Sequence, residues 1–114
     1  MKLQQFRKLV LRLLILIASF PVTSSADTPV VELVIRDHHF EPTDVPIPVN
    51  TKVKLLIKNR DPTSEEFESY ELKREKVISG NSEGVVFIGP LPAGSYPFFG
   101  DFSPDTAQGR VIVE

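Results

Sequence analysis

The fold is decided by Leu91-Pro92-Ala93-Gly94-Ser95-Tyr96-Pro97-Phe98-Phe99-Gly100-Asp101-Phe102, continued by Gly109-Arg110-Val111-Ile112-Val113. This order predicts a turn, an aromatic strand, a short loop and a closing strand. Gly94 is expected to take the left-handed position of the turn. Tyr96 follows at the spacing where its hydroxyl reaches back to the turn backbone, as in the tyrosine corner of Greek-key sandwiches. Phe98, Phe99 and Phe102 are expected to pack in the core and the loop.

Further strands are predicted upstream of this segment. Apolar residues alternate with polar ones over residues 31–36 and 52–58, and residues 85–88 and 111–113 are short apolar runs. Proline, glycine and Asn50, which tolerates positive φ, separate these runs. Short strands at this spacing predict an all-β fold, a Greek-key β-sandwich.

One charged stretch departs from this pattern. Residues 64–76 are rich in Glu, Lys and Arg, and the spacing of Glu71 and Glu75 is compatible with one or two helical turns. We expect a short helix or an irregular excursion there, leading into a strand near Tyr70–Lys73. A solvated charged face with no ligand is the simplest explanation of such a run.

The first 26 residues have the features of a signal peptide. A basic start is followed by an apolar run from Leu13 to Phe20 and by small residues ending at Ala26. The apolar run is too short to span a bilayer. We therefore expect cleavage near Ala26, export to the periplasm, and no stable membrane insertion afterwards; a retained amphipathic anchor is the alternative. Residues 27–114 then form one domain of 88 residues.

Charge and composition exclude several functions for residues 27–114. All fifteen acids and nine of the thirteen bases lie there, which gives a net charge of −6 and argues against nucleic acid as a partner. The chain contains no cysteine, so thiol catalysis, zinc–thiolate sites and iron–sulfur clusters are excluded. Hydrolase and phosphate-loop motifs are absent from the sequence, and no catalytic residue is assigned.

Together these segments resemble the cupredoxins. The matching segments are Asp37-His38-His39-Phe40-Glu41-Pro42, Val49-Asn50-Thr51-Lys52-Val53, Lys58-Asn59-Arg60-Asp61 and residues 91–113. Others resemble the cupredoxin-like exported proteins of bacterial iron-permease systems: Glu65-Glu66-Phe67-Glu68-Ser69, Arg74-Glu75-Lys76, Phe98-Phe99-Gly100-Asp101-Phe102 and Asp105-Thr106-Ala107-Gln108-Gly109. The resemblance implies a cupredoxin-like domain over residues 27–114, with an iron permease and a periplasmic metal-binding protein as partners.

The same resemblance implies that the blue-copper ligands are replaced. Glu66 stands at about the place of the first histidine and Gly100 at that of the cysteine. Ser103 stands roughly at the second histidine, and Ala107 or Gln108 at the methionine. A blue-copper centre needs two histidines and a thiolate, so electron transfer through such a centre is excluded.

Carboxylates are the candidate metal ligands that remain. If the fold brings Glu66 and Asp101 to one end of the sandwich, they are first-choice ligands, with Glu68 and Asp105 as further candidates. Oxygen ligands suit hard cations such as Fe(III), Mn, Mg or Ca. Crowded carboxylates should also raise at least one pKa. Glu65 is another acid able to approach this end.

Two histidines add weaker candidates. His38 and His39 are adjacent, and neighbouring side chains on a regular strand point in opposite directions, so we expect at most one of them to bind an ion. The leading hypothesis is an exported accessory of iron uptake that binds iron, or copper used to oxidise Fe(II). A ferroxidase would need an electron acceptor that the sequence does not identify. The alternatives are a metal-free protein-binding module acting through its acidic surface, and a copper carrier using one histidine.

Overall fold

The computed structural model describes residues 27–114, so the predicted signal peptide lies outside the described residues. This part of the chain contains nine strands, and no helix in it meets the length and apolarity that a membrane crossing requires. The strands are β1 (Val30–Arg36), β2 (His39–Glu41), β3 (Asp44–Ile47), β4 (Val53–Asn59), β5 (Glu65–Ser69), β6 (Arg74–Ile78), β7 (Glu83–Ile88), β8 (Gly94–Gly100) and β9 (Gln108–Val113). The predicted all-β sandwich is confirmed.

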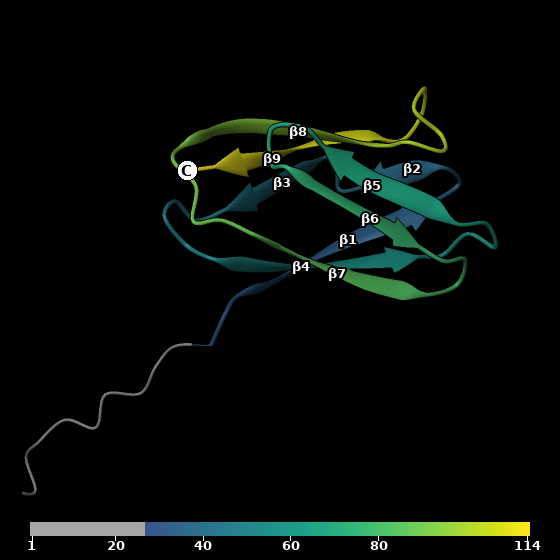
Figure 1. Cartoon of the computed structure of the whole chain (residues 1–114), viewed down its shortest axis with the longest axis horizontal. Coiled ribbons are helices and arrows are strands. Elements are labelled where there is room, and N and C mark those ends of the chain that lie inside the picture. Colours follow the sequence, from purple (N-terminus) through teal and green to yellow (C-terminus); the bar gives the residue numbers. More distant parts are fainter. Residues whose placement is uncertain (1–26) are drawn as a thin grey trace, which may run out of the picture.

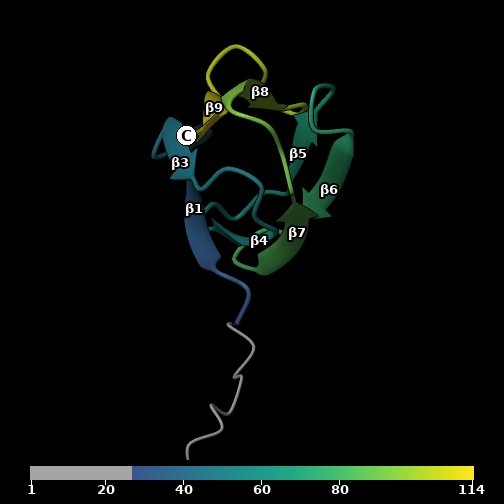
Figure 2. The same cartoon turned by 90° about the vertical axis from the view of Figure 1, so that its left-hand side faces the viewer.

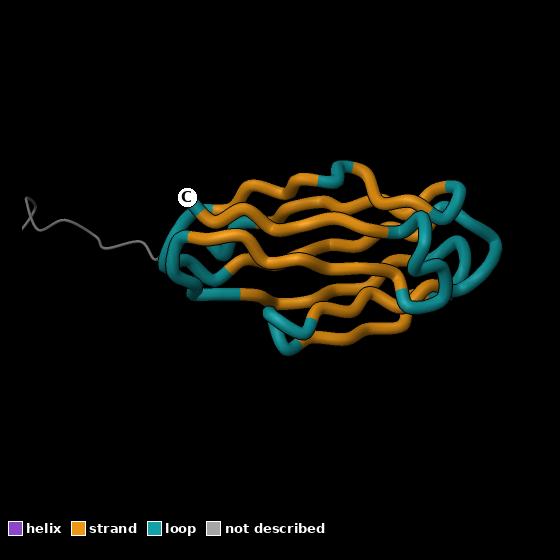
Figure 3. The backbone as a smooth tube through the Cα atoms, turned by 90° about the horizontal axis from the view of Figure 1, so that it is seen from above, coloured by secondary structure: helices purple, strands orange, loops and turns teal. Residues whose placement is uncertain are grey.

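Two sheets face each other across the core (Figures 1 and 2). One has the strand order β2-β1-β4-β7 and the other β3-β9-β8-β5-β6. Both sheets are mixed, because β1 pairs in parallel with β4 and β3 in parallel with β9. The loops gather mainly at the two ends of the sandwich (Figure 3). One of these ends holds the β8–β9 loop, which begins at Asp101.

The core follows the alternation of the strands. On β4 the burial pattern is strict: Val53, Leu55 and Ile57 are fully buried. Phe40 and Phe98 meet edge to face at 5.0 Å between ring centroids, an arrangement that the charge distribution of aromatic rings favours. Phe98 therefore packs as predicted.

Three local predictions need correction. The charged stretch forms the antiparallel hairpin β5–β6 instead of a helix or an irregular excursion, because side chains alternate inward and outward along β5, and Tyr70–Lys73 is the turn of that hairpin and not a strand. Gly94 opens β8 without positive φ, whereas Gly89 has φ of 82°. Phe102 is 53% exposed and does not pack in the core.

Two turn predictions are confirmed. The hydroxyl of Tyr96 donates to the carbonyl of Pro92 at 2.8 Å, which is the reach back to the turn that the spacing predicted. Asn50 adopts positive φ, at 53°. The N–H of Asn50 donates to the carbonyl of Leu91 at 3.0 Å, so both turns are held together at the end of the sandwich opposite the β8–β9 loop.

Candidate metal centre

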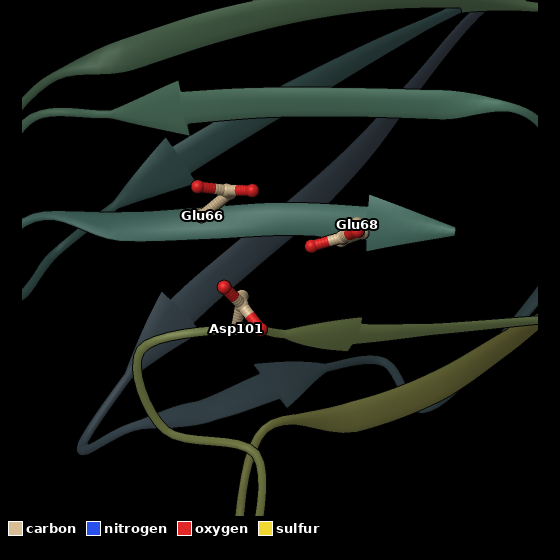
Figure 4. A group of neighbouring side chains, drawn as sticks. All are labelled: Glu66, Glu68 and Asp101. Carbon is tan, nitrogen blue, oxygen red and sulfur yellow. The ribbon is translucent and has the colours of Figure 1, made fainter. Parts of the chain in front are cut away.

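Three carboxylates meet on the outer face of the second sheet. Glu66 and Glu68 lie two residues apart on β5, so they point to the same side, and Asp101 directly follows β8 (Figure 4). The N–H of Asp101 donates to the carbonyl of Glu66 at 2.9 Å, which places the two side chains next to each other. One carboxylate oxygen from each of the three residues lies within 4.8 Å of the others. The predicted proximity of Glu66 and Asp101 is therefore confirmed.

This spacing fits a single cation. Hard ions take oxygen ligands at about 2.0–2.6 Å, so two ligands of one ion lie up to roughly 5 Å apart. The 4.8 Å limit of the cluster is within that reach. Three carboxylates and no nitrogen or sulfur are a donor set typical of Fe(III), Mn, Mg or Ca sites.

The three carboxylates of the cluster lie close enough for their negative charges to repel one another. Partial desolvation of the carboxyl, with the negative charges of Asp101 and Glu66 beside it, raises the pKa of Glu68. Glu75 on β6 lies directly opposite Glu68 and adds to this effect. Within residues 27–114, no lysine or arginine forms an ion pair with Glu66, Glu68 or Asp101. The rise of a carboxyl pKa expected from crowding falls on Glu68.

Glu65, and not Glu66, points into the molecule toward the positions expected to replace the copper ligands. A Cβ built on Gly100 would lie 2.7 Å from the Glu65 carboxyl carbon and 2.7 Å from the Cβ of Ala107. A cysteine at position 100 therefore has no room. With no cysteine in the chain, the residues here do not fit a blue-copper centre. Sequence reasoning missed this role of Glu65, although its spacing of two from Phe67 places it on the inward face.

The remaining predicted ligands lie outside the cluster. His38 is in the β1–β2 turn with φ of 61°, and its Nδ1 is 3.3 Å from Ser103 Oγ. The Nδ1 of His39 donates to the carbonyl of Asp37 at 2.7 Å, which leaves its Nε2 free. Asp105 is exposed in the β8–β9 loop. A metal role for these three residues stays a prediction.

A buried polar network beside His38 was not foreseen. Asp61, only 7% exposed, accepts hydrogen bonds from the backbone N–H groups of Asp37 at 2.8 Å and His38 at 3.0 Å. Desolvation acts to raise the pKa of Asp61, but these hydrogen bonds and the nearby His38 imidazole outweigh it and lower the pKa. Asn59 in turn accepts from the N–H of Asp61. The network fixes the β1–β2 turn, where two residues have positive φ.

Comparison with known proteins defines the class. The family described as "Cupredoxin-like domain" matches residues 9–113, and this chain belongs to that family. A relative in Rickettsia prowazekii (strain Madrid E), "Uncharacterized protein RP394", is 47% identical over 83 residues. The match covers 73% of this chain and 66% of that relative, just under two thirds of its length.

Solved structures of copper proteins share the fold at low sequence identity. Auracyanin A, a blue copper protein from Chloroflexus aurantiacus, matches with a TM-score of 0.66 at 12% identity, covering 77% of this chain and 100% of its own. The metal-binding domain of the Cu(I)-exporting ATPase CopA from Streptococcus pneumoniae D39 matches with a TM-score of 0.67 at 14% identity, covering 82% of this chain and 94% of its own. Amicyanin from Paracoccus versutus matches with a TM-score of 0.59 at 20% identity, covering 85% of this chain and 87% of its own. At these identities the likeness is one of fold.

Proposed function

We propose that this protein is an exported accessory of iron uptake that binds a hard cation, Fe(III) above all, through Glu66, Glu68 and Asp101. The observation that carries the proposal is the convergence of three carboxylate oxygens within 4.8 Å at one end of a cupredoxin-like sandwich. Desolvation first, and then the negative charges of Asp101 and Glu66, raise the pKa of Glu68, and a cation held between the three carboxylates would offset that repulsion.

Fe(III) suits this set of three carboxylates better than Fe(II) or Cu(I) does. Carboxylates favour Fe(III) over Fe(II), since the harder and more highly charged ion gains more from charged oxygens, and Cu(I) prefers sulfur. The cluster supports the binding of a cation, and not a catalysed oxidation of Fe(II). The link to iron uptake, with an iron permease and a periplasmic metal-binding protein as partners, is supported by the resemblance of the segments around residues 65–76 and 98–109.

Equilibrium dialysis of the metal-free protein against Fe(III) citrate, Mn(II) and Cu(II) tests the proposal. We expect one Fe(III) per chain, with clearly weaker uptake by Glu66→Gln and Asp101→Asn. Glu83→Gln is the matched control, because it removes the same charge from an exposed acid on β7 in the other sheet. Unaltered Fe(III) uptake by both cluster variants would remove this site.

The alternative of a metal-free docking module has one observation in its favour. Tyr70, in the turn that follows β5, is 70% exposed, packs on Phe99 at 5.5 Å between ring centroids, and lines the same surface hollow as Glu68. An exposed aromatic ring beside acids is a composition found at protein interfaces. If dialysis shows no uptake of any of the three ions, this alternative becomes the leading one.

A further inference from the structure

Glu65 is a buried acid directly beneath the metal centre. Its side chain is 2% exposed, and it comes from the inward face of β5, opposite to Glu66 and Glu68. Its Oε1 accepts two backbone hydrogen bonds, from the N–H of Glu66 at 3.0 Å and from the N–H of Phe102 at 2.9 Å. Its Oε2 is buried with no hydrogen-bond partner among residues 27–114.

These two bonds reach both chain segments that carry the cluster. One is made with Glu66 itself, and the other with the residue that follows Asp101. The bond from the N–H of Asp101 to the carbonyl of Glu66 adds a third connection between the same segments. The β5–β8 ladder pairs only Phe67 with Gly100 and Glu68 with Phe99, and these connections extend the link between the two segments to Asp101.

The burial of Glu65 is unfavourable for stability alone. A buried polar atom with no partner costs about 1–3 kcal/mol, and more when it is charged. Its carboxyl also occupies the space beside Gly100, since any side chain on Gly100 would collide with the Glu65 carboxyl and with Ala107. An apolar residue at position 65 would avoid the cost of the unpartnered Oε2, but it has no acceptor for the N–H groups of Glu66 and Phe102.

We infer that Glu65 is a positioning residue, which holds Asp101 against Glu66 and Glu68 so that the three carboxylates are already gathered before a cation binds. This inference rests on the proposed function. Residues that orient metal ligands without touching the ion change metal affinity by about 10–100-fold when they are replaced.

Two substitutions separate positioning from general stability. Glu65→Leu keeps a similar volume and removes the acceptor, whereas Glu65→Gln keeps Oε1 as an acceptor for both N–H groups. We expect Glu65→Leu to bind Fe(III) at least tenfold more weakly and Glu65→Gln to stay close to the wild type. Ile47→Val is the matched control, because it loosens the core at the end of β3, in register with Val113 and away from the cluster.

Isothermal titration with Fe(III) citrate gives the affinities, and amide hydrogen exchange of Phe102 gives the state of the bond. Weaker binding together with faster Phe102 exchange in Glu65→Leu, and neither change in Glu65→Gln or Ile47→Val, supports the inference. If Glu65→Leu does not fold, Glu65→Ala takes its place.

Two results overturn the inference, and they differ in what else they remove. If Glu65→Leu binds like the wild type while Asp101→Asn binds weakly, Glu65 has no positioning role and the proposed function stands. If the wild type binds no Fe(III), both the proposed function and this role for Glu65 are removed.

Discussion

Glu65 and Glu66 are adjacent acids in opposite surroundings, because side chains alternate across a strand. The first lies in the interior among backbone N–H donors, and the second shares the outer face with Glu68 and Asp101. A shift of one residue in the pairing of β5 would exchange these two surroundings. The register of Phe67 with Gly100, fixed by the burial of Phe67, therefore determines which acid can meet a cation.

Replacing Glu68 should have opposite effects on stability and on binding. Its pKa is raised in the folded protein, so its contribution to stability is favourable at low pH and is lost as the pH rises through that raised pKa. At neutral pH the charged form is repelled by Asp101 and Glu66. Glu68→Gln should therefore raise the thermal midpoint of the cation-free protein by a few degrees at most and weaken Fe(III) binding. Calorimetry that shows a lowered midpoint without cation would contradict this account.

The Asp61 carboxylate should stabilise the protein in a pH-dependent way. Its pKa is lowered from 3.8, so its contribution is present above that value and is lost as the pH falls through the lower folded pKa. Asp61→Asn puts a donor where the N–H of His38 or Asp37 needs an acceptor. We expect it to cost about 1–3 kcal/mol at neutral pH, measured by urea denaturation.

The pH series needs a control of the same chemical kind. Asp105→Asn removes an exposed carboxylate from the β8–β9 loop, and it should change the free energy of unfolding by less than about 0.5 kcal/mol. The difference between Asp61→Asn and the wild type should shrink in acid. A difference that stays constant with pH would show that charge is not the cause.

For single residues, the sequence predicted the position of the outward-facing acids Glu66 and Asp101 better than that of the buried acid Glu65. The resemblance placed Glu66 and Asp101 at one end, and their backbone bond shows that they meet. It gave Glu66 only an approximate place, and it did not separate Glu66 from Glu65, whose side chain lies on the opposite, buried face of β5. The role of Asp61 was out of reach, since its partners are backbone groups 23 and 24 residues away.

The hairpin of β5 and β6 shows how tertiary pairing overrides local preference. Its charge density and the spacing of Glu71 and Glu75 favoured a helical turn, but Phe67 must reach the core while pairing with both β6 and β8. The buried positions of β5, every second residue, hold Glu65, Phe67 and Ser69, so burial follows the strand alternation although only Phe67 is apolar. Strands with clear alternation, such as β4, were predictable from the sequence, because their period of two is visible without knowledge of the pairing partner.

Two glycines in neighbouring strands should respond differently to alanine. A Cβ on Gly109 in β9 would lie 2.5 Å from the Phe98 ring, whereas a Cβ on Gly94 in β8 would meet Tyr96 at an ordinary 3.5 Å. We expect Gly109→Ala to cost about 1–3 kcal/mol through overpacking and Gly94→Ala to change stability by less than about 0.5 kcal/mol. Urea denaturation checks both, and equal effects would show that the approach of Gly109 to Phe98 is not tight.

For the whole molecule, cation binding should appear as added stability. A ligand that binds only the folded state stabilises it by about 2.7 kcal/mol at a hundred times its Kd, which for a domain of 88 residues is a rise of roughly 10 °C or more in the thermal midpoint. Glu66→Gln should show a smaller rise and Glu83→Gln the wild-type rise. Calorimetry at increasing Fe(III) citrate tests this, and a midpoint that does not depend on the ion would contradict it.

The place of β9 has a consequence for how the polypeptide matures. This strand, the last in the described chain, lies inside its sheet between β3 and β8, and it pairs with β3 across 66 residues of sequence, Asp44 with Arg110. Such distant pairing is slow to form. A nascent chain that still lacks residues 108–113 would leave β3 unpaired and the edge of β8 open, and open edges recruit other chains. Before β9 pairs with β3 and β8, a chaperone that covers these open strand edges would protect the chain from aggregation more than at any later stage of folding.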